Sequence, residues 1–319
     1  MNQKLSFSSY LMIGSMLFGL FFGAGNLIFP VHLGQESGSA VFLATLGFLV
    51  TATGLPFLGV IAMGFSQSSG LFELSSRVHP AFGYMMTVLL YLTIGPFFAL
   101  PRTGTVSFEI GFAPYIAPEY KSIGLACFTI AFFGTALFFS MRPSKILVWV
   151  GKILNPLFLI FLAVLIMISF VNPMGVAAEA PIQEAYTTAP FFKGFTEGYN
   201  TMDALASLAF AIIVIRTIKD LGLKEPKDIA LGTVKAGIVV VVLMAVIYSC
   251  LAYIGASSIG KFELSANGGI ALRQVAQYYF GTKGSVLLAI IVTLACLKTA
   301  IGLITACAET FHGLFPNVM

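Results

Sequence analysis

Near the N-terminus, an apolar and otherwise helix-forming run is interrupted by Phe21-Phe-Gly-Ala-Gly-Asn-Leu-Ile-Phe-Pro30. Two glycines and a proline this close together weaken a helix, because glycine adds backbone freedom and proline removes an N–H donor. In hydrocarbon, an unwound backbone leaves N–H and C=O groups that cost several kcal/mol each unless protein, water or a ligand pairs with them. The interruption is therefore either a packing kink, since glycine and proline are common in membrane helices, or a binding site for a solute.

A binding site at this interruption would suit an amino acid. The freed N–H groups and the positive end of the following half-helix attract a carboxylate, whereas the C=O groups that end the preceding half attract sodium or an ammonium group. The residues placed to contact such a substrate are Gly23, Ala24, Gly25 and Asn26. One broken helix could thus hold a zwitterion.

The composition indicates a membrane protein. Hydrophobic residues make up 58% of the chain, charged residues make up 9%, and the mean hydropathy is +0.96, far from the values of soluble domains. A helix needs about 20 apolar residues to cross the hydrocarbon core. Runs of this kind predict eight spans, at about 8–33, 40–63, 82–101, 122–140, 153–171, 197–218, 236–256 and 285–310. The chain is therefore expected to be an all-α polytopic membrane protein whose residues 1–319 form a single transmembrane domain.

The basic residues predict the orientation of these spans, since short cytoplasmic loops collect Lys and Arg. With the N-terminus inside, ten basic residues lie on the cytoplasmic side: Lys4, Arg77, Arg142, Lys145, Lys152, Arg216, Lys219, Lys224, Lys227 and Lys235. The other side then holds six, which are Arg102, Lys121, Lys193, Lys261, Arg273 and Lys283, and Lys298 falls inside a span. A cytoplasmic N-terminus is favoured.

Several functions are disfavoured by the sequence. The histidines, His32, His79 and His312, fall near predicted span ends, and the four cysteines lie in apolar spans without metal-ligand spacing, which argues against an enzyme or a metal cluster. A passive channel would favour a continuous polar face in several spans, whereas a broken helix favours alternating access. The net charge of +4 reflects topology and does not imply nucleic-acid binding. No organic cofactor and no obligate protein partner is indicated.

Motifs along the chain resemble those of one known family, the branched-chain amino acid:cation symporters. The first is Gly23-Ala-Gly-Asn26 followed by Phe29-Pro30. The others, in the family's order, are Gly54-Leu-Pro56, Gly95-Pro-Phe-Phe-Ala-Leu-Pro-Arg-Thr-Gly-Thr-Val-Ser-Phe-Glu109, Gly198-Tyr-Asn-Thr-Met-Asp203, Ser265-Ala-Asn-Gly268 and Thr299-Ala-Ile-Gly-Leu303. The resemblance covers essentially the whole chain.

This resemblance implies the leucine-transporter fold, in which helices one to five and six to ten form inverted repeats and the first and sixth helices are broken at the substrate. The first repeat would cover about 8–171, and an incomplete second repeat about 197–319. Family members are expected to have about twelve spans, so the chain is expected to be truncated at its C-terminus. The implied function is import of leucine, isoleucine and valine across the cell membrane, with a cation as coupling ion.

The resemblance also implies contacts in the sixth span, although no glycine marks its break. Ser207-Leu-Ala-Phe210 is similar to the family's substrate-contacting segment, which implies Ser207 near the polar end of the ligand and Phe210 against its side chain. Asp203 is either a cation ligand or proton carrier, because an ionisable group in a span is costly without a role, or a cap of the sixth helix.

The implied sodium ligands are the carbonyl groups of Gly19 and Phe22 and the hydroxyl of Thr299. The position next to Thr299 is Lys298, where the family's fold would complete the cage with a hydroxyl. A Lys298 ammonium could replace the ion and favour proton coupling or ion-independent exchange. Alternatively Lys298 points away and leaves sodium its site. Sodium is the leading expectation, and H⁺ is the alternative coupling ion.

Two expectations concern the outer boundary of the membrane. Arg102 and Glu109 lie seven residues apart, about two helical turns, and are expected to form an ion pair. The turn Ser265-Ala-Asn-Gly-Gly269 is expected to precede a short external helix over 270–280.

Overall fold

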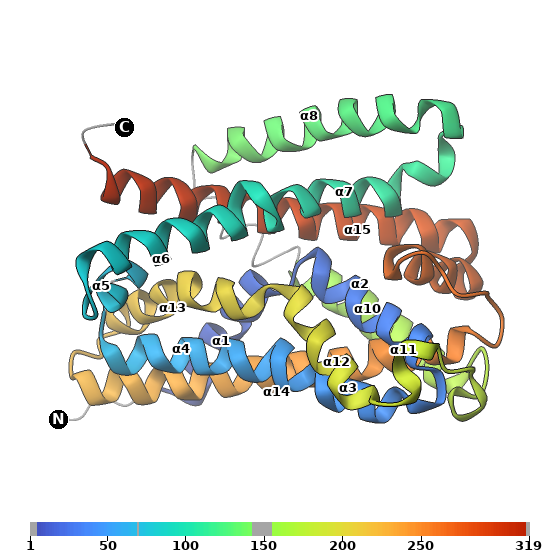
Figure 1. The fold of residues 1–319 in the computed structure, drawn as a ribbon, viewed down its shortest axis with the longest axis horizontal. Coiled ribbons are helices and arrows are strands. Elements are labelled where there is room, and N and C mark those ends of the chain that lie inside the picture. Colours follow the sequence, from blue (N-terminus) through green and yellow to red (C-terminus); the bar gives the residue numbers. More distant parts are fainter. Residues whose placement is uncertain (1–4, 69, 142–154, 317–319) are drawn as a thin grey trace.

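The computed structural model describes residues 5–68, 70–141 and 155–316, and within these ranges all regular structure is helical (Figure 1). Of the predicted features, Lys4, Arg142, Lys145, Lys152 and the first two residues of the span 153–171 lie outside the described residues.

The α-helices, in chain order, are α1 (Phe7–Phe21), α2 (Ala24–Ser37), α3 (Val41–Leu49), α4 (Leu55–Ser66), α5 (Leu71–Ser76), α6 (Pro80–Leu92), α7 (Ala99–Gly111), α8 (Lys121–Ser140), α10 (Asn155–Val171), α11 (Glu184–Thr187), α12 (Pro190–Gly198), α13 (Asp203–Asp220), α14 (Pro226–Ser258) and α15 (Gly268–Leu314). Two π-helical turns, η2 (Val50–Gly54) and η3 (Thr93–Phe97), join α3 to α4 and α6 to α7. A 3₁₀ turn, η8 (Tyr199–Thr201), follows α12.

The helices are apolar enough for a membrane protein, but the expected number of spans is not confirmed. Each of the eight predicted ranges overlaps an apolar helix. By length and composition, five helices of the described chain could cross a membrane, or six if the bent pair Pro190–Thr201 and Asp203–Asp220 is one span. Two further apolar helices, Phe7–Phe21 and Pro156–Val171, are shorter.

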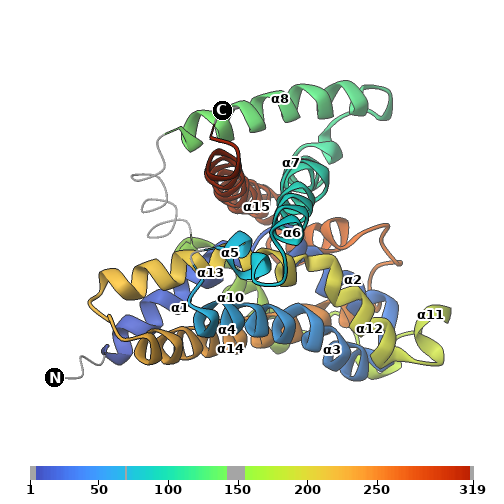
Figure 2. The same cartoon turned by 60° about the vertical axis from the view of Figure 1, so that its left-hand side comes forward.

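The long helices run side by side along the long axis of the molecule (Figure 1). The start of α1, the end of α15 and α5 lie at one end, and the turn between α2 and α3 lies at the other. Figure 2 shows that α7 and α15 separate α8 from the remaining helices. Only 11% of the most apolar stretch of this helix is buried, and its Ile123, Ile130 and Leu137 side chains are exposed. Such exposure suits a helix that faces lipid.

Small residues let α2 and α14 approach closely. A Cβ atom added to Gly34 of α2 would lie less than 3.0 Å from backbone atoms of Ala252 in α14, and one added to Gly255 of α14 would meet the Val31 carbonyl of α2 in the same way. Such reciprocal contacts of backbone with backbone are the usual means of tight helix packing in membranes, where burial of apolar area supplies no driving force. This packing fixes how α14 faces α2.

The turn and the short helix predicted over 265–280 are confirmed, and their external location stays a prediction. Asn267 precedes α15 and accepts a hydrogen bond on Oδ1 from the Ile270 N–H at 3.0 Å, which caps the helix. Gly281 interrupts α15 with a φ of 63°, a backbone conformation that glycine adopts at little cost. The segment before Gly281 is therefore a separate short helix that precedes the membrane-spanning part.

The predicted Arg102–Glu109 ion pair is wrong. The Arg102 guanidinium donates to the Asn200 carbonyl and lies over the Phe29 ring, 5.1 Å from its centroid. Glu109 instead accepts a hydrogen bond from Asn267 Nδ2 at 2.9 Å. Seven residues span about 10 Å along a helix, so each side chain finds a nearer partner on another element.

The contact between α2 and α14 predicts a stability difference between two glycine substitutions. Gly255→Ala should lower the free energy of unfolding by about 1–3 kcal/mol, because its methyl group has no room beside the Val31 carbonyl. Gly134→Ala on α8, where no atom lies within 4 Å, should leave stability unchanged or slightly raised. Thermal unfolding of both purified variants in detergent measures this. Equal unfolding temperatures for Gly255→Ala and the unaltered protein would contradict the close packing.

Candidate functional site

The first helical break lies between α1 and α2, as the sequence predicts. Phe22 and Gly23 have extended backbone angles, whereas the chain is helical again from Ala24 through Pro30. The interruption is shorter than the stretch that predicts it, because proline in the interior of α2 removes one hydrogen bond without ending the helix. The N–H of Gly23 would pair with the Gly19 carbonyl in a continuous helix, but it donates to Asn26 Oδ1 at 2.9 Å. The Gly19 carbonyl therefore loses its helical donor.

The second break lies between η8 and α13. Met202 has a φ of 63°, in the left-handed region, and the helices on either side are bent by 45°. A left-handed residue other than glycine costs about 1–2 kcal/mol, which makes it an unusual choice unless surrounding contacts hold it. The break expected within the span 197–218 is therefore present, but its position at Met202 could not be predicted, because methionine gives no sequence signal for such a conformation.

A buried hydrogen-bond network joins the two breaks. Asn26 Nδ2, on the first turn of α2, donates to Asp203 Oδ2 at 2.5 Å and also to the Tyr248 hydroxyl of α14. The Tyr248 hydroxyl in turn donates to Asp203 Oδ2 at 3.2 Å. Asn26 and Asp203 are 2% and 3% exposed, and Tyr248 is fully buried. Since a buried carboxylate is costly without donors, Asn26 and Tyr248 hold Asp203 at the meeting point of the two breaks.

The alternative that Asp203 caps its helix is wrong. Met202 occupies the capping position, and no side-chain hydrogen bond is made there. The Asp203 carboxylate faces α2 and α14, whereas its N–H donates to Thr201 Oγ1 at 3.4 Å. Asp203 thus begins α13 but directs its charge away from the helix's own N–H groups.

A small cavity of about 40 Å³ lies between the breaks and is called the central cavity below. Among the substrate, cation and coupling residues proposed from the sequence, six line it: Gly23, Gly25, Asn26, Asp203, Phe210 and Thr299. Phe210 is 1% exposed, and its ring centroid lies 6.0 Å from that of Phe21. The cavity therefore has a polar side near the network and an apolar side at Phe210.

Thr299 of α15 lies directly beside the first break. A Cβ atom added to Gly23 would be 3.0 Å from Thr299 Oγ1, and this hydroxyl donates to the Ala295 carbonyl at 3.2 Å. Lys298 is also buried, with 8% of its surface exposed, but it does not line the central cavity. Adjacent helical residues point about 100° apart, so only Thr299 faces the break.

Ser207, Gly19 and Phe22, which were also proposed from the sequence, do not line the central cavity. Ser207 donates to the Ala204 carbonyl at 2.7 Å and packs at Gly59 of α4. Gly19 and Phe22 are buried in α1 and at its end without lining the cavity. The backbone of Ala24 begins α2. Ser207 is thus separated from the ligand position that the resemblance implies for it.

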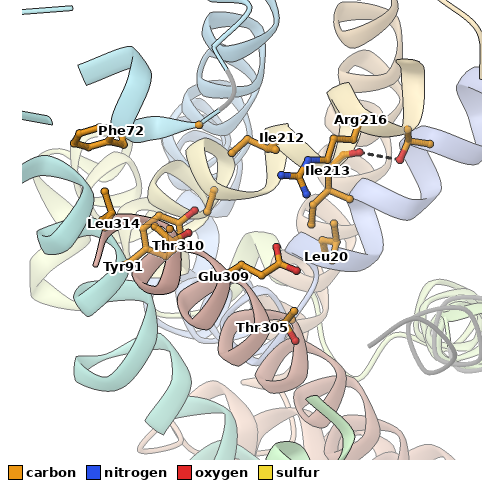
Figure 3. A pocket seen from close by; sticks show the side chains of 16 residues that line it. Leu20, Phe72, Tyr91, Ile212, Ile213, Arg216, Thr305, Glu309, Thr310 and Leu314 are labelled. Carbon is orange, nitrogen blue, oxygen red and sulfur yellow. Dashed lines mark hydrogen bonds between the residues drawn. The ribbon is translucent and has the colours of Figure 1, made fainter. Parts of the chain in front are cut away.

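A second and larger cavity of about 420 Å³, called the vestibule below, lies between α1, α13 and α15 (Figure 3). Leu20 lines both the vestibule and the central cavity. Arg216 of α13 and Glu309 of α15 also line the vestibule. It lies toward the end of the molecule that holds α5 and the end of α15 (Figure 1).

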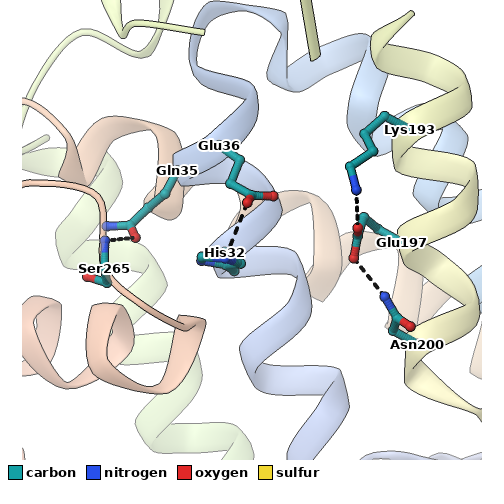
Figure 4. Close-up of polar contacts among 7 residues, drawn as sticks. All are labelled: His32, Gln35, Glu36, Lys193, Glu197, Asn200 and Ser265. Carbon is teal, nitrogen blue, oxygen red and sulfur yellow. Dashed lines mark hydrogen bonds and ion pairs between the residues drawn. The ribbon is translucent and has the colours of Figure 1, made fainter. Parts of the chain in front are cut away.

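At the opposite end, polar contacts link neighbouring segments (Figure 4). Gln35 of α2 donates to Ser258 Oγ at 2.9 Å and accepts from the Ser265 N–H at 3.2 Å, which ties the loop after α14 to the end of α2. Lys193 and Glu197 of α12 form an ion pair at 2.6 Å. Gln35 therefore holds the loop after α14 against α2 at this end.

Three residues of the site were missed in the sequence. Tyr248 is the third member of the network, and Arg102 lines the central cavity. Thr201 Oγ1 accepts a hydrogen bond from the Asp203 N–H at the start of α13. A hydroxyl-bearing tyrosine within the apolar span 236–256 was an available signal for Tyr248. Nothing in the sequence placed Arg102 at the cavity, because its position depends on how α7 packs against α2.

Comparisons with known proteins agree with the sequence motifs. The profile of a family described as "Branched-chain amino acid transport protein" matches residues 6–319. A branched-chain amino acid permease BrnQ of Lactobacillus delbrueckii subsp. lactis is 49% identical over 321 residues, covering 100% of this chain and 72% of the relative. A BrnQ permease of Bacillus subtilis is 48% identical over 318 residues, with the same coverage.

A more distant relative, branched-chain amino acid transport system 2 carrier protein of Pseudomonas aeruginosa, is 39% identical over 306 residues, which are 96% of this chain and 69% of the relative. These matches extend over the breaks, the network and Thr299. The chain belongs to the branched-chain amino acid transport protein family.

Proposed function

We propose that this protein imports leucine, isoleucine and valine by symport with a cation, Na⁺ being the leading candidate. The observation that carries the proposal is the meeting of two broken helices around the central cavity, joined by Asn26, Asp203 and Tyr248. The names of the relatives support the substrate class. The geometry of the site gives no comparable support to the alternatives, an enzyme or a passive channel.

The proposed substrate position follows from the charges around the central cavity. The first N–H groups of α2 have no partner within the helix and carry the positive end of its dipole, which suits the carboxylate. The ammonium group would face the Asp203 carboxylate. The aliphatic side chain would pack against Phe210 and Leu303, which line the apolar side.

The size of the central cavity supports alternating access. Ligand pockets usually measure about 300–1,000 Å³, whereas this cavity measures about 40 Å³. Binding of a leucine would therefore require the helices around the breaks to move apart. Such movement around a fixed site is the expected mode of transport for a fold with broken helices.

The proposed cation position lies next to the substrate, between α1 and α15. Its ligands would be the Gly19 carbonyl, which lacks its helical donor, the Phe22 carbonyl and Thr299 Oγ1, beside Gly23. One net positive charge moving inward at about 100 mV releases about 2.3 kcal/mol, enough for about fifty-fold accumulation of a zwitterion. In the alternative, Lys298 or Asp203 carries a proton or replaces the ion. The position of Thr299 at the break favours sodium.

The proposal includes the arrangement in the cell membrane. We infer a leucine-transporter-like inverted-repeat fold with the α1/α2 break in the first repeat and the η8/α13 break as its counterpart in the second. We also infer a cytoplasmic N-terminus, supported by three basic residues on elements that line the vestibule: Arg77 at the end of α5, and Arg216 and Lys219 in the last turns of α13. The vestibule would then open toward the cytoplasm.

Uptake of labelled leucine into proteoliposomes tests the function. An inward sodium gradient should drive accumulation of leucine. Unlabelled valine and isoleucine should inhibit this uptake at concentrations within about one to two orders of magnitude of that needed for unlabelled leucine, since one methylene in an apolar pocket is worth about 1–3 kcal/mol. Absence of leucine uptake under both sodium and proton gradients would exclude the proposed substrate.

Replacement of Thr299 distinguishes sodium coupling from coupling through Lys298. Thr299→Val keeps the shape of the side chain but removes Oγ1, so the sodium concentration for half-maximal uptake should rise at least about tenfold, a loss of about 1.4 kcal/mol. Thr299→Ser keeps the hydroxyl and should stay near the unaltered value. Uptake driven by protons and indifferent to sodium in all three proteins would instead support the role of Lys298.

Replacement of Asp203 tests the network. Asp203→Asn keeps the size of the side chain but removes the charge that accepts from Asn26 and Tyr248, and hydrogen bonds to charged groups contribute about 1.5–3 kcal/mol. Uptake per folded molecule should fall at least about tenfold. The control is Asp220→Asn at the exposed end of the same helix, which should transport normally. Normal transport by Asp203→Asn would show that transport does not need the Asp203 carboxylate.

A further inference from the structure

The vestibule carries two opposite charges that the proposed transport site does not use. Arg216 lies one turn before the end of α13, and Glu309 lies on α15. Figure 3 shows both side chains directed into the space between these helices. Within the described ranges, the two ion pairs are His32–Glu36 and Lys193–Glu197, so neither Arg216 nor Glu309 is neutralised by an ion pair. A positive and a negative group thus face one cavity from different helices.

The remaining walls are suited to an aliphatic group. Leu20, Ile212, Ile213 and Leu314 line the vestibule, with the hydroxyl groups of Thr305 and Thr310 among them (Figure 3). The volume of about 420 Å³ lies within the usual range of about 300–1,000 Å³ for small-molecule sites. Apolar walls with a few convergent polar groups are the common construction of such sites.

We propose that the vestibule is a second binding site for an amino-acid zwitterion with an aliphatic side chain. The Arg216 guanidinium would take the carboxylate, since its planar fork matches a carboxylate with two parallel hydrogen bonds. The Glu309 carboxylate would take the ammonium group. The side chain would lie against Leu20 and the two isoleucines of α13. This site goes beyond the transport function proposed above and rests on it for the substrate class.

The position of Leu20 links the two sites. Its side chain lines the vestibule and the central cavity, so a molecule in the vestibule lies one side chain away from the transported substrate. A zwitterion that leaves the central cavity on this side would meet Arg216 and Glu309 next. The second site would therefore hold substrate on its way out of the protein.

The test is equilibrium binding of labelled leucine to the purified protein in detergent. The unaltered protein should bind two equivalents. Arg216→Gln and Glu309→Gln should each weaken one of the two sites at least about tenfold, the effect of about one charge-assisted hydrogen bond, and leave the other unchanged. Lys219→Gln removes the same charge from the exposed end of α13 outside the vestibule and should still bind two equivalents.

Two probes that carry one charge each show which residue binds which group. Binding of 4-methylpentanoate, which lacks the ammonium group, should be weakened by Arg216→Gln and not by Glu309→Gln. Binding of 3-methylbutylamine, which lacks the carboxylate, should show the reverse. Equal losses of both probes in both variants would overturn the proposal, because a collapsed cavity and not a lost charge would explain them.

Leucine uptake, measured on the same preparations, distinguishes a failure of the vestibule proposal from a failure of the proposed transport function. One bound equivalent in the unaltered protein, together with normal leucine uptake, would overturn the vestibule site alone. Absence of both binding and uptake would overturn the vestibule site together with the transport function.

Discussion

The contact between Asn26 and Asp203 connects the two places where the backbone leaves the helical conformation. Each break removes hydrogen bonds that a continuous helix would supply, and hydrocarbon offers no water to replace them. Asn26 compensates on its own side by accepting from the Gly23 N–H, and its amide reaches Asp203 at the start of α13. The two breaks therefore stabilise each other, and the polar groups needed for substrate binding are concentrated where they meet.

This contact depends in turn on the close packing of α2 against α14. Tyr248 and Gly255 lie seven residues apart on α14 and so share a face. Because Gly34 and Gly255 allow the two backbones to approach, the Tyr248 hydroxyl comes within reach of both Asn26 and Asp203. Glycine contacts near one end of the helices thus set the position of a hydroxyl group at the breaks. Phe22, whose ring lies 6.2 Å from that of Tyr248, adds an aromatic contact at the same point.

The two cavities differ in a way that follows from the packing around them. The central cavity is small, because the polar network and Phe210 fill the space between the breaks. The vestibule is about ten times larger by volume, about 420 against about 40 Å³, and lies between α1, α13 and α15. At the other end, Gln35 binds the loop after α14 and keeps the segments together. The cavity that shares Leu20 with the central cavity therefore lies toward α5, on the side that the proposed orientation assigns to the cytoplasm.

The sequence by itself determined the membrane class, the approximate positions of the helices and the first break. These properties depend on local features: the length of apolar runs, and glycines that weaken a helix wherever it packs. The motifs also identified the family, which the comparisons confirm. Tertiary structure alone decided the position of the second break at Met202, the true partners of Arg102 and Glu109, and the orientation of Ser207 away from the central cavity. It also brought together Asn26 and Asp203, which lie 177 positions apart. Such contacts depend on the rotation and approach of packed helices, and a change of one residue in register turns a side chain by about 100°. No local pattern in the sequence specifies that rotation.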